Sequence, residues 1–298
     1  MFSSLRAIFL HLRLPFSWFL LPIWLVTVCI SPNFGGERLG LTFIILHFLL
    51  YPASNAFNSY FDRDEGPIGA MKQPPAVNKG VYWISLLLDV AAIWLALKIS
   101  VVFMLMILGY SLASRAYSHP TVRVKRYPVT GFLYTAFFQG LYTVSMTYIG
   151  LNDYPITSVF KEKVLFAGAI TSILLMAIYP LTQIYQHAED ARRGDQTISM
   201  RLGIRGTFHF AAGLFVIALA AVTVFLGHWL PVVPVKDLFL SLAPAMVYFG
   251  WWYWKVRRDD RAADWRSLTV LMVLASTGLN VFFFRAFLLV SNVAQVFS

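Results

Sequence analysis

The chain has 298 residues, of which 58% are apolar and only 13% are charged, and its formal net charge is +10. Soluble domains carry about 25% charged residues. This composition, with a mean hydropathy of +0.67, therefore excludes an ordinary soluble domain and indicates a chain solvated mostly by lipid. Cys29 is the only cysteine, which excludes an intrachain disulfide and a cysteine-based metal site.

Nine apolar runs predict the membrane-spanning elements in chain order. A bilayer core requires about 20 mostly apolar residues in each helix, because unpaired backbone groups are too costly in hydrocarbon. The runs lie near residues 15–31, 40–58, 81–99, 101–118, 129–150, 164–185, 206–228, 236–254 and 268–290. The sequence thus predicts an all-α fold, a polytopic membrane bundle of about nine transmembrane helices that forms one membrane-embedded domain over residues 1–298.

The first run has a second interpretation as a signal peptide, since Arg6 and Arg13 precede it. No small-residue cleavage site follows it, and the segment from Ser31 to Arg38 has the composition of a loop. We therefore expect a retained helix.

The basic residues predict the orientation of the bundle. With nine spans, the N-terminal segment and the even-numbered loops hold 18 of them, whereas the other loops hold five (Arg38, Lys98, Lys161, Lys163 and Lys236). Such a bias marks the cytoplasmic side, and it explains the excess of positive charge better than nucleic-acid binding does. We expect an integral protein of a bacterial inner (plasma) membrane, with its active site on the cytoplasmic side.

Two acidic clusters lie at helix ends on that side, where carboxylates are costly and usually functional. The first closes the second span and contains Asn58, Asp62, Asp64 and Glu65; the second follows the sixth span and contains Gln186, Glu189 and Asp190. Asn58 and Asp62 are four residues apart, as are Gln186 and Asp190, so each helix end presents an amide and a carboxylate on one face. Two such faces turned toward each other would suit Mg²⁺, whereas either cluster alone could be a solvated helix end.

Basic residues accompany both clusters. Lys72 follows the first, and Arg123, Lys125 and Arg126 follow the fourth span. Cations beside metal-bound carboxylates could neutralise a departing diphosphate, although each has an alternative role as a topology determinant. The Lys125–Arg126 pair is the best candidate for a role in the site.

These residues resemble the UbiA superfamily of intramembrane prenyltransferases over most of the chain. The first family motif, Asn-Asp-x-x-Asp-x-x-x-Asp, is matched by Asn58 and Asp62, and the second, Asp-x-x-x-Asp with a following Gly-x-x-Thr, by Asp190, Gly194 and Thr197. Ser59, Gly66 and Gln186 replace motif aspartates. The departures leave the number of metal ions open.

The resemblance implies site residues and partners. It implies catalytic roles for Asp62, Asp190, Lys125 and Arg126, substrate binding by Asn58, Lys72, Gln186, Arg13 and Tyr117, and metal binding by Asp62, Asp190, Asp64, Glu65 and Glu189. The implied cofactor is Mg²⁺. The implied partners are a prenyl diphosphate, a lipophilic acceptor and membrane lipid, with no nucleic acid.

The implied activity is transfer of a prenyl group to a lipophilic, aromatic acceptor within the membrane. One alternative is an intramembrane terpene cyclase of the same superfamily, in which the cation is captured within the prenyl chain. The other is a non-catalytic membrane protein or a transporter. Transport sites usually lie near mid-membrane, whereas the acids here lie at one side.

Overall fold

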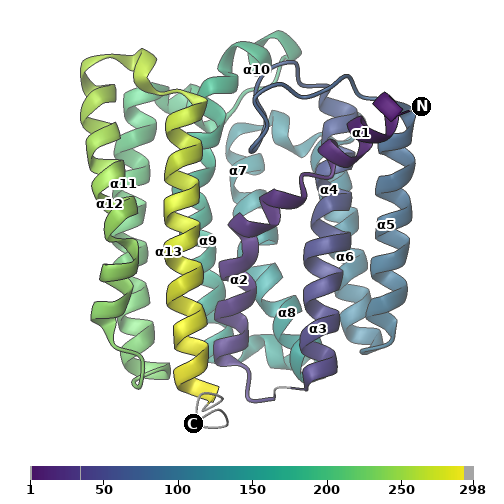
Figure 1. Cartoon of the computed structure of the whole chain (residues 1–298), viewed down its shortest axis with the longest axis vertical. Helices are drawn as coiled ribbons and strands as arrows, with labels where there is room; N and C mark the ends of the chain where they lie inside the picture. The colour runs from purple at the N-terminus through teal and green to yellow at the C-terminus, as the bar shows by residue number, and fades with distance from the viewer. Residues whose placement is uncertain (1, 34, 292–298) are drawn as a thin grey trace.

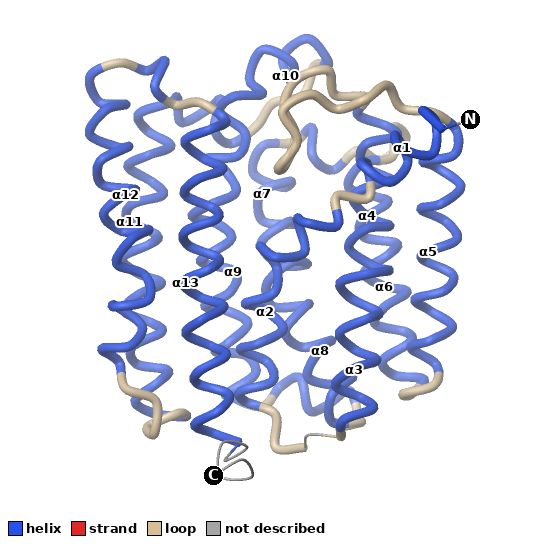
Figure 2. The backbone as a smooth tube through the Cα atoms, in the orientation of Figure 1, coloured by secondary structure: helices blue, strands red, loops and turns tan. Residues whose placement is uncertain are grey.

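The computed structural model describes residues 2–33 and 35–291, and within them every regular element is a helix (Figures 1 and 2). Nine helical segments run between the two ends of the bundle. They are α2 (Ser17–Ile30), preceded by α1 (Phe2–His11) and the turn η1 (Leu14–Phe16); α3 (Gly36–Ile44), η2 (Ile45–Leu50) and α4 (Tyr51–Asp62); α5 (Lys79–Leu97); α6 (Val101–Ser118); α7 (Pro128–Ala136), η4 (Phe137–Tyr142) and α8 (Thr143–Asn152); α9 (Glu162–Gln183); α11 (Ile198–Trp229); α12 (Val235–Arg258); and α13 (Trp265–Ser291).

The prediction of about nine transmembrane helices is confirmed by these segments. Seven of the segments in the described residues are long and apolar enough to cross a membrane, and the other two are α7–α8 and α12. The structure adds the short helix α10 (His187–Arg193) after the turn η6 (Ile184–Gln186), and the turn η3 (Val124–Arg126) before α7. The sequence predicted none of these short elements, because they lack a long apolar run.

Local chemistry sets where several helices begin. Asn78 caps α5 by accepting a hydrogen bond from the Gly80 amide at 2.8 Å, and Ser100 caps α6 by accepting one from the Phe103 amide at 3.1 Å. Thr197 caps α11 in the same way, and Pro128 opens α7, where its missing N–H costs nothing. Helices that start at fixed residues present fixed faces to the bundle interior.

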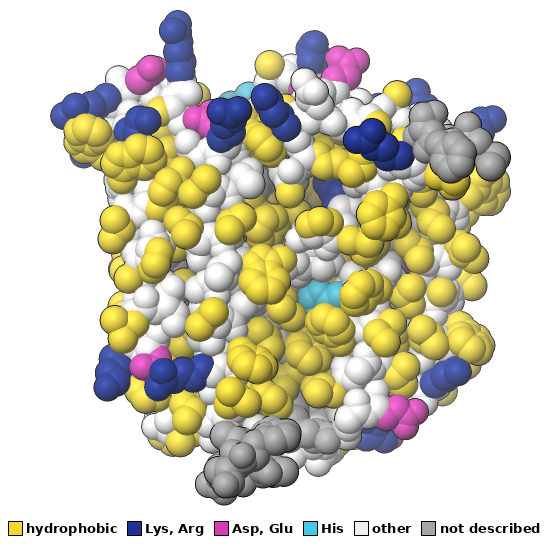
Figure 3. Space-filling model, viewed as in Figure 1, with side chains coloured by type: hydrophobic (Ala, Val, Ile, Leu, Met, Phe, Trp, Pro, Cys, Tyr) yellow, Lys and Arg dark blue, Asp and Glu magenta, His cyan; other side chains and the backbone are white. Residues whose placement is uncertain are grey.

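One end of the bundle carries most of the basic residues, and we call it the basic end. There α4, α6, α9 and α12 finish, α5, α7, α11 and α13 begin, and α10 lies across the top of the view in Figure 1. Figure 3 shows Lys and Arg side chains gathered at both ends of the visible face, with a broad hydrophobic surface between them. That surface matches the hydrocarbon region of a bilayer.

Two ion pairs join charged residues of neighbouring spans, and pairing lowers the cost of a charge in a low-dielectric interior. Asp89 of α5 contacts Arg115 of α6 and accepts a 2.8 Å hydrogen bond from Ser111. Arg285 of α13 forms an ion pair with Asp237 of α12 at 3.1 Å. These pairs fasten neighbouring helices and leave the interior free for a cavity.

Candidate active site

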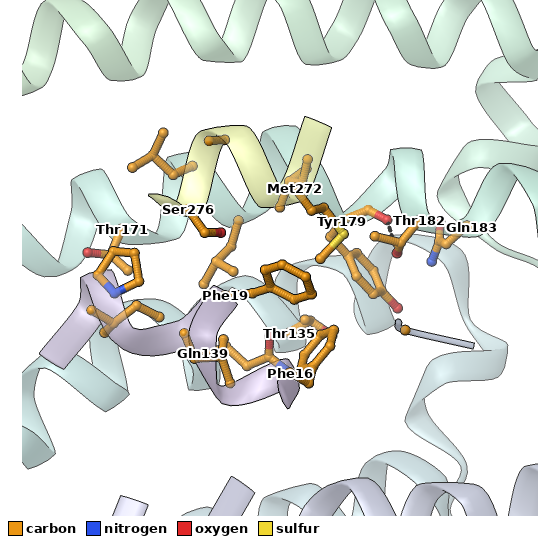
Figure 4. A pocket seen from close by; sticks show the side chains of 18 of the residues that line it. Phe16, Phe19, Thr135, Gln139, Thr171, Tyr179, Thr182, Gln183, Met272 and Ser276 are labelled. Carbon is orange, nitrogen blue, oxygen red and sulfur yellow. Dashed lines mark hydrogen bonds between the residues drawn. The ribbon is translucent and has the colours of Figure 1, made fainter. Parts of the chain in front are cut away.

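A cavity of about 610 Å³ opens among α2, α4, α6, α7, α9 and α11–α13. Its charged lining residues, which together define the charged end of the cavity, all come from the segments at the basic end: Arg13, Asp62, Asp64, Lys125, Asp190 and Asp195. Toward the middle of the bundle the lining becomes apolar and aromatic, with Phe16 and Phe19 projecting into the space (Figure 4). The cavity therefore suits a molecule with an ionic head and an apolar tail.

Asp62 is the buried carboxylate at the end of α4, with 7% of its surface exposed. Lys125 contacts it directly from η3, and Arg123 approaches it at 3.8 Å. Arg123 also binds Asp195 with two hydrogen bonds of 2.8 and 2.7 Å. These hydrogen bonds to Asp195 raise the pKa of Arg123, so the guanidinium stays charged and joins the two acidic segments.

A second set of contacts joins the same two acidic segments. Arg193 of α10 binds Asp64 at 2.7 Å and Glu189 at 2.5 Å. Glu189 in turn accepts a 2.8 Å hydrogen bond from the Glu65 amide, and the Gln186 side chain reaches the Pro67 carbonyl at 3.5 Å. The two acidic clusters thus meet at one end of one cavity.

Arg13 enters this end from the other side. It lies between α1 and η1 in the left-handed region, with φ 49° and ψ 42°, a conformation that costs a residue with a Cβ about 1–2 kcal/mol. Its guanidinium donates a 2.7 Å hydrogen bond to Ser59, and its buried Nε has no hydrogen-bond partner in the described residues. The cation therefore lines the cavity, and no carboxylate in the described part of the chain contacts it.

The neutral residues predicted for the site lie nearby. Asn58 lines the cavity and donates to the Ser118 hydroxyl at 2.9 Å. Tyr117 lines it too, and its hydroxyl contacts that of Tyr179. Figure 4 shows Tyr179, Thr182 and Gln183 on the wall formed by α9.

Other predicted residues stay outside the cavity lining. Lys72 and Glu65 are exposed, and Glu189 serves to join the two acidic segments. Arg126 is exposed and stacks on the Tyr127 ring, 4.7 Å from its centroid. The sequence did not predict the ion pairs that Arg123, Arg193 and Asp195 form, because these pairs join segments that lie far apart in the chain.

The loop after α4 is fastened to the last helix. Gly69 has φ 51°, and a Cβ there would lie 3.3 Å from the Phe16 ring. Its carbonyl accepts a 2.8 Å hydrogen bond from the indole of Trp265, the first residue of α13. The loop is thereby held over the charged end of the cavity.

The donor set fits a hard divalent cation in its chemistry. Four carboxylates (Asp62, Asp64, Asp190 and Asp195) line one cavity together with the amide groups of Asn58 and Gln186, and oxygen ligands are those that Mg²⁺ prefers. Asp190 makes no hydrogen bond or ion pair through its carboxylate within the described residues. No three acidic, His or Cys side chains of that part of the chain are already gathered as metal ligands, so a metal would compete with the basic partners of Asp62 and Asp64.

A helical membrane bundle with a charged cavity end and an aromatic interior has the features of an enzyme for amphipathic substrates. The sequence matches the UbiA prenyltransferase family over residues 19–288. No curated protein matches the sequence significantly.

Solved structures of low sequence identity share the fold. A UbiA homologue from Archaeoglobus fulgidus bound to GPP and Mg²⁺ is 16% identical, with a TM-score of 0.65 over 94% of this chain and 99% of that one. A UbiA homologue from Archaeoglobus fulgidus bound to Cd²⁺ is 17% identical, with a TM-score of 0.63 over 96% of this chain and 99% of that one. A structure described for digeranylgeranylglyceryl phosphate synthase in membranes is 14% identical, with a TM-score of 0.60 over 96% and 100%.

The chain belongs to the UbiA prenyltransferase family. It is an integral membrane enzyme of the prenyl-transferring class, which confirms the family and the class predicted from the sequence.

Proposed function

We propose that this protein transfers a prenyl group from a prenyl diphosphate to a lipophilic, aromatic acceptor, with Mg²⁺ as cofactor. The observation that carries this proposal is the division of one cavity into a charged end and an aromatic interior. A prenyl diphosphate has the matching division into an anionic head and an apolar chain. The GPP and Mg²⁺ bound by the Archaeoglobus fulgidus homologue support the same substrate class.

In this proposal the cations hold the diphosphate. Arg13 is the first contact, since it lines the cavity and no carboxylate from residues 2–33 or 35–291 contacts it. Lys125 contacts Asp62 across the charged end and is placed to neutralise charge as the C–O bond breaks. Lys72 and Arg126 are at most peripheral, because both are exposed.

Asp62 and Asp190 are the proposed metal ligands, with Asp64 nearby and Asn58 and Gln186 as neutral partners. A bound Mg²⁺ would neutralise charge on the diphosphate and thereby favour departure of the diphosphate. Glu65 and Glu189 would contribute by joining the two acidic segments through the hydrogen bond between the Glu65 amide and the Glu189 carboxylate.

The aromatic lining suits the allylic cation left behind. Phe16, Phe19, Tyr117 and Tyr179 line the same cavity, and ring faces attract a cation in a dry environment. The same apolar lining excludes water, which would otherwise capture the cation. We also propose that the basic end faces the cytoplasm of a bacterial inner membrane, because positive charge accumulates there.

Asp62→Asn and Asp190→Asn test the proposal in protein reconstituted into nanodiscs with GPP, Mg²⁺ and an added aromatic acceptor. We expect each variant to lower diphosphate release by about 10²–10³-fold, the size of a lost electrostatic contribution to a transition state. Asp260→Asn is the matched control, since Asp260 lies in an exposed pair with Arg205 at 2.8 Å. Full activity in both site variants would exclude the proposed site.

Incubation with GPP alone separates the two enzymatic alternatives. Release of diphosphate with a cyclic hydrocarbon product would favour the cyclase, whereas release that requires an added aromatic acceptor favours the transferase. Failure of the wild-type protein to bind GPP with or without Mg²⁺ would favour a non-catalytic role.

A further inference from the structure

The last two turns of α12 carry two tryptophans and two cations on one outward face. Trp251, Trp254, Lys255 and Arg258 lie at positions i, i+3, i+4 and i+7, which share one side of a helix. All four residues are exposed, Trp251 to 46% and Trp254 to 51%. We call these four residues the Trp–cation face.

Each cation of this face stacks on a tryptophan ring. The Lys255 Nζ lies 4.6 Å from the centroid of the Trp251 ring, and the Arg258 guanidinium lies 3.8 Å from the centroid of the Trp254 ring. Lys255 and Arg258 are three residues apart, so they are neighbours on the helix surface. The rings therefore hold two positive charges close together at the end of α12.

Three aspartates follow this face in the chain, and another group engages each of them. The Asp259 carboxylate accepts a 2.9 Å hydrogen bond from a backbone amide of the turn that follows, and the Asp264 carboxylate accepts one of 2.9 Å from the first turn of α13. Asp260 pairs with Arg205 of α11 at 2.8 Å. The acids nearest in sequence thus already have partners.

The cations of the Trp–cation face lack such partners. Across residues 2–33 and 35–291, no carboxylate forms an ion pair with Lys255 or Arg258. Arg257, which lies between them in the chain, is also exposed. The charge gathered at this point is therefore available to an anion from outside the protein.

The same side of α12 is apolar farther from the basic end. Leu240 and Val247 precede Trp251 by eleven and four residues, so they lie on its side of the helix, and they are exposed to 69% and 74%. In Figure 3 basic side chains lie over the ends of α11–α13 at the upper left, next to large hydrophobic side chains. Tryptophan rings favour the headgroup level of a bilayer, so this face spans the boundary between headgroups and hydrocarbon.

This arrangement matches an anionic amphiphile. A headgroup phosphate would meet the two cations, and attached acyl chains would lie along the apolar side of the helix. A zwitterionic lipid carries its own cation, which the same residues would repel. A nucleic acid would need the tryptophan rings for base stacking, but those rings are turned toward lipid.

We infer that the Trp–cation face of α12 binds the headgroup of an anionic phospholipid. The site lies on the outer surface of the bundle and is separate from the catalytic cavity. It is independent of the proposed prenyl transfer and assigns the protein a specific lipid partner.

Native mass spectrometry of the full-length protein in detergent micelles tests the site by titration with dioleoylphosphatidylglycerol or dioleoylphosphatidylcholine. We expect the wild type to bind its first phosphatidylglycerol at least about tenfold more tightly, because basic residues at the membrane surface attract anionic headgroups. The double variant Lys255→Gln/Arg258→Gln should reduce this preference by at least about fivefold. Trp254→Leu keeps both charges and removes one ring, so it should reduce the preference by about twofold.

Arg6→Gln/Arg192→Gln is the matched control, because it removes two exposed cations from the same end of the bundle; it should keep the preference. All variants should bind GPP as the wild type does, and this separate measurement distinguishes failure of the lipid site from failure of the proposed function. Equal affinity of the wild type for the two lipids, an unchanged preference in Lys255→Gln/Arg258→Gln, or an equal loss in the control would overturn the inference. Loss of GPP binding in Lys255→Gln/Arg258→Gln would contradict the independence of the two sites.

Discussion

At the scale of single residues, the charged end is a balance of carboxylates and cations. Asp62 contacts Lys125, Asp64 is held by Arg193 and Asp195 by Arg123. Among the residues that the structure describes, by contrast, no acid contacts Arg13 and no base contacts the Asp190 carboxylate. An incoming anion would pair with Arg13, and a divalent cation would pair with Asp190. Arg123 is the link that keeps the acidic segments together.

The Arg123–Asp195 pair is expected to stabilise the fold. Arg123→Met and Asp195→Asn should each lower the free energy of unfolding in mixed micelles, and the double variant should cost less than the sum of the two. We expect a coupling energy of about 1–3 kcal/mol from the cycle. Additive single effects would show that the pair contributes no specific stability.

The coupling should also be constant across neutral pH. The pKa of Arg123 is raised in the folded state, so its contribution is present below the unfolded pKa and is lost only as pH rises through the folded one. Both values lie far above neutrality for arginine.

At the scale of elements, the π turns interrupt two of the spans. η2 divides α3 from α4, and η4 divides α7 from α8. In η4 the close contact between Gly140 and Ser172 lets α9 supply the hydrogen bonds that the turn disturbs. The neighbour helix, and not the turn itself, therefore maintains the irregular backbone.

Gly140→Ala is expected to destabilise the protein, because its methyl group would overlap the Ser172 backbone and overpacking costs about 1–3 kcal/mol. Gly213→Ala is the control: a Cβ there meets nothing within 4 Å in α11, so the change should be neutral or stabilising by up to about 1 kcal/mol. Thermal unfolding in mild detergent measures both. Equal midpoints for the two variants would contradict the packing argument.

At the scale of the whole molecule, charge and hydrophobic surface define an orientation. The visible face has basic side chains at both ends and an apolar region between them (Figure 3), and the greater number of basic residues lies beside the charged end of the cavity. The diphosphate would therefore approach from the aqueous side at the basic end, which we propose to be the cytoplasm.

Single cysteines test this orientation in a Cys29→Ala background, which removes the only native, buried thiol. Arg201→Cys lies at the start of α11 at the basic end, and Lys98→Cys lies after α5 at the opposite end; both positions are exposed. In intact bacterial cells, a membrane-impermeant maleimide should label only Lys98→Cys, and both after lysis. The reverse pattern would place the site outside.

The helical spans were predictable because hydrocarbon requires long apolar runs, and the acidic helix ends because helical spacing places Asn58 beside Asp62. The π turns were not, since a continuous apolar run contains no sign of an extra residue in one turn. Which of the neighbouring cations Arg123, Lys125 and Arg126 contact the acidic residues depends on the backbone at Arg123, whose φ is 43°. The arginine side chain gives no reason to expect this conformation. The pairing of Arg193 with Asp64 depends on the tertiary fold.

The hydrogen bond between Trp265 and Gly69 joins two parts of the enzyme with different tasks. α13 forms part of the cavity flank, and the loop that carries Gly69 covers the place where the ionic head would rest. Any outward tilt of the first turn of α13 must either stretch this bond or draw the loop with it. The position of the first turn of α13 and the position of the loop over the charged end are therefore coupled through one hydrogen bond.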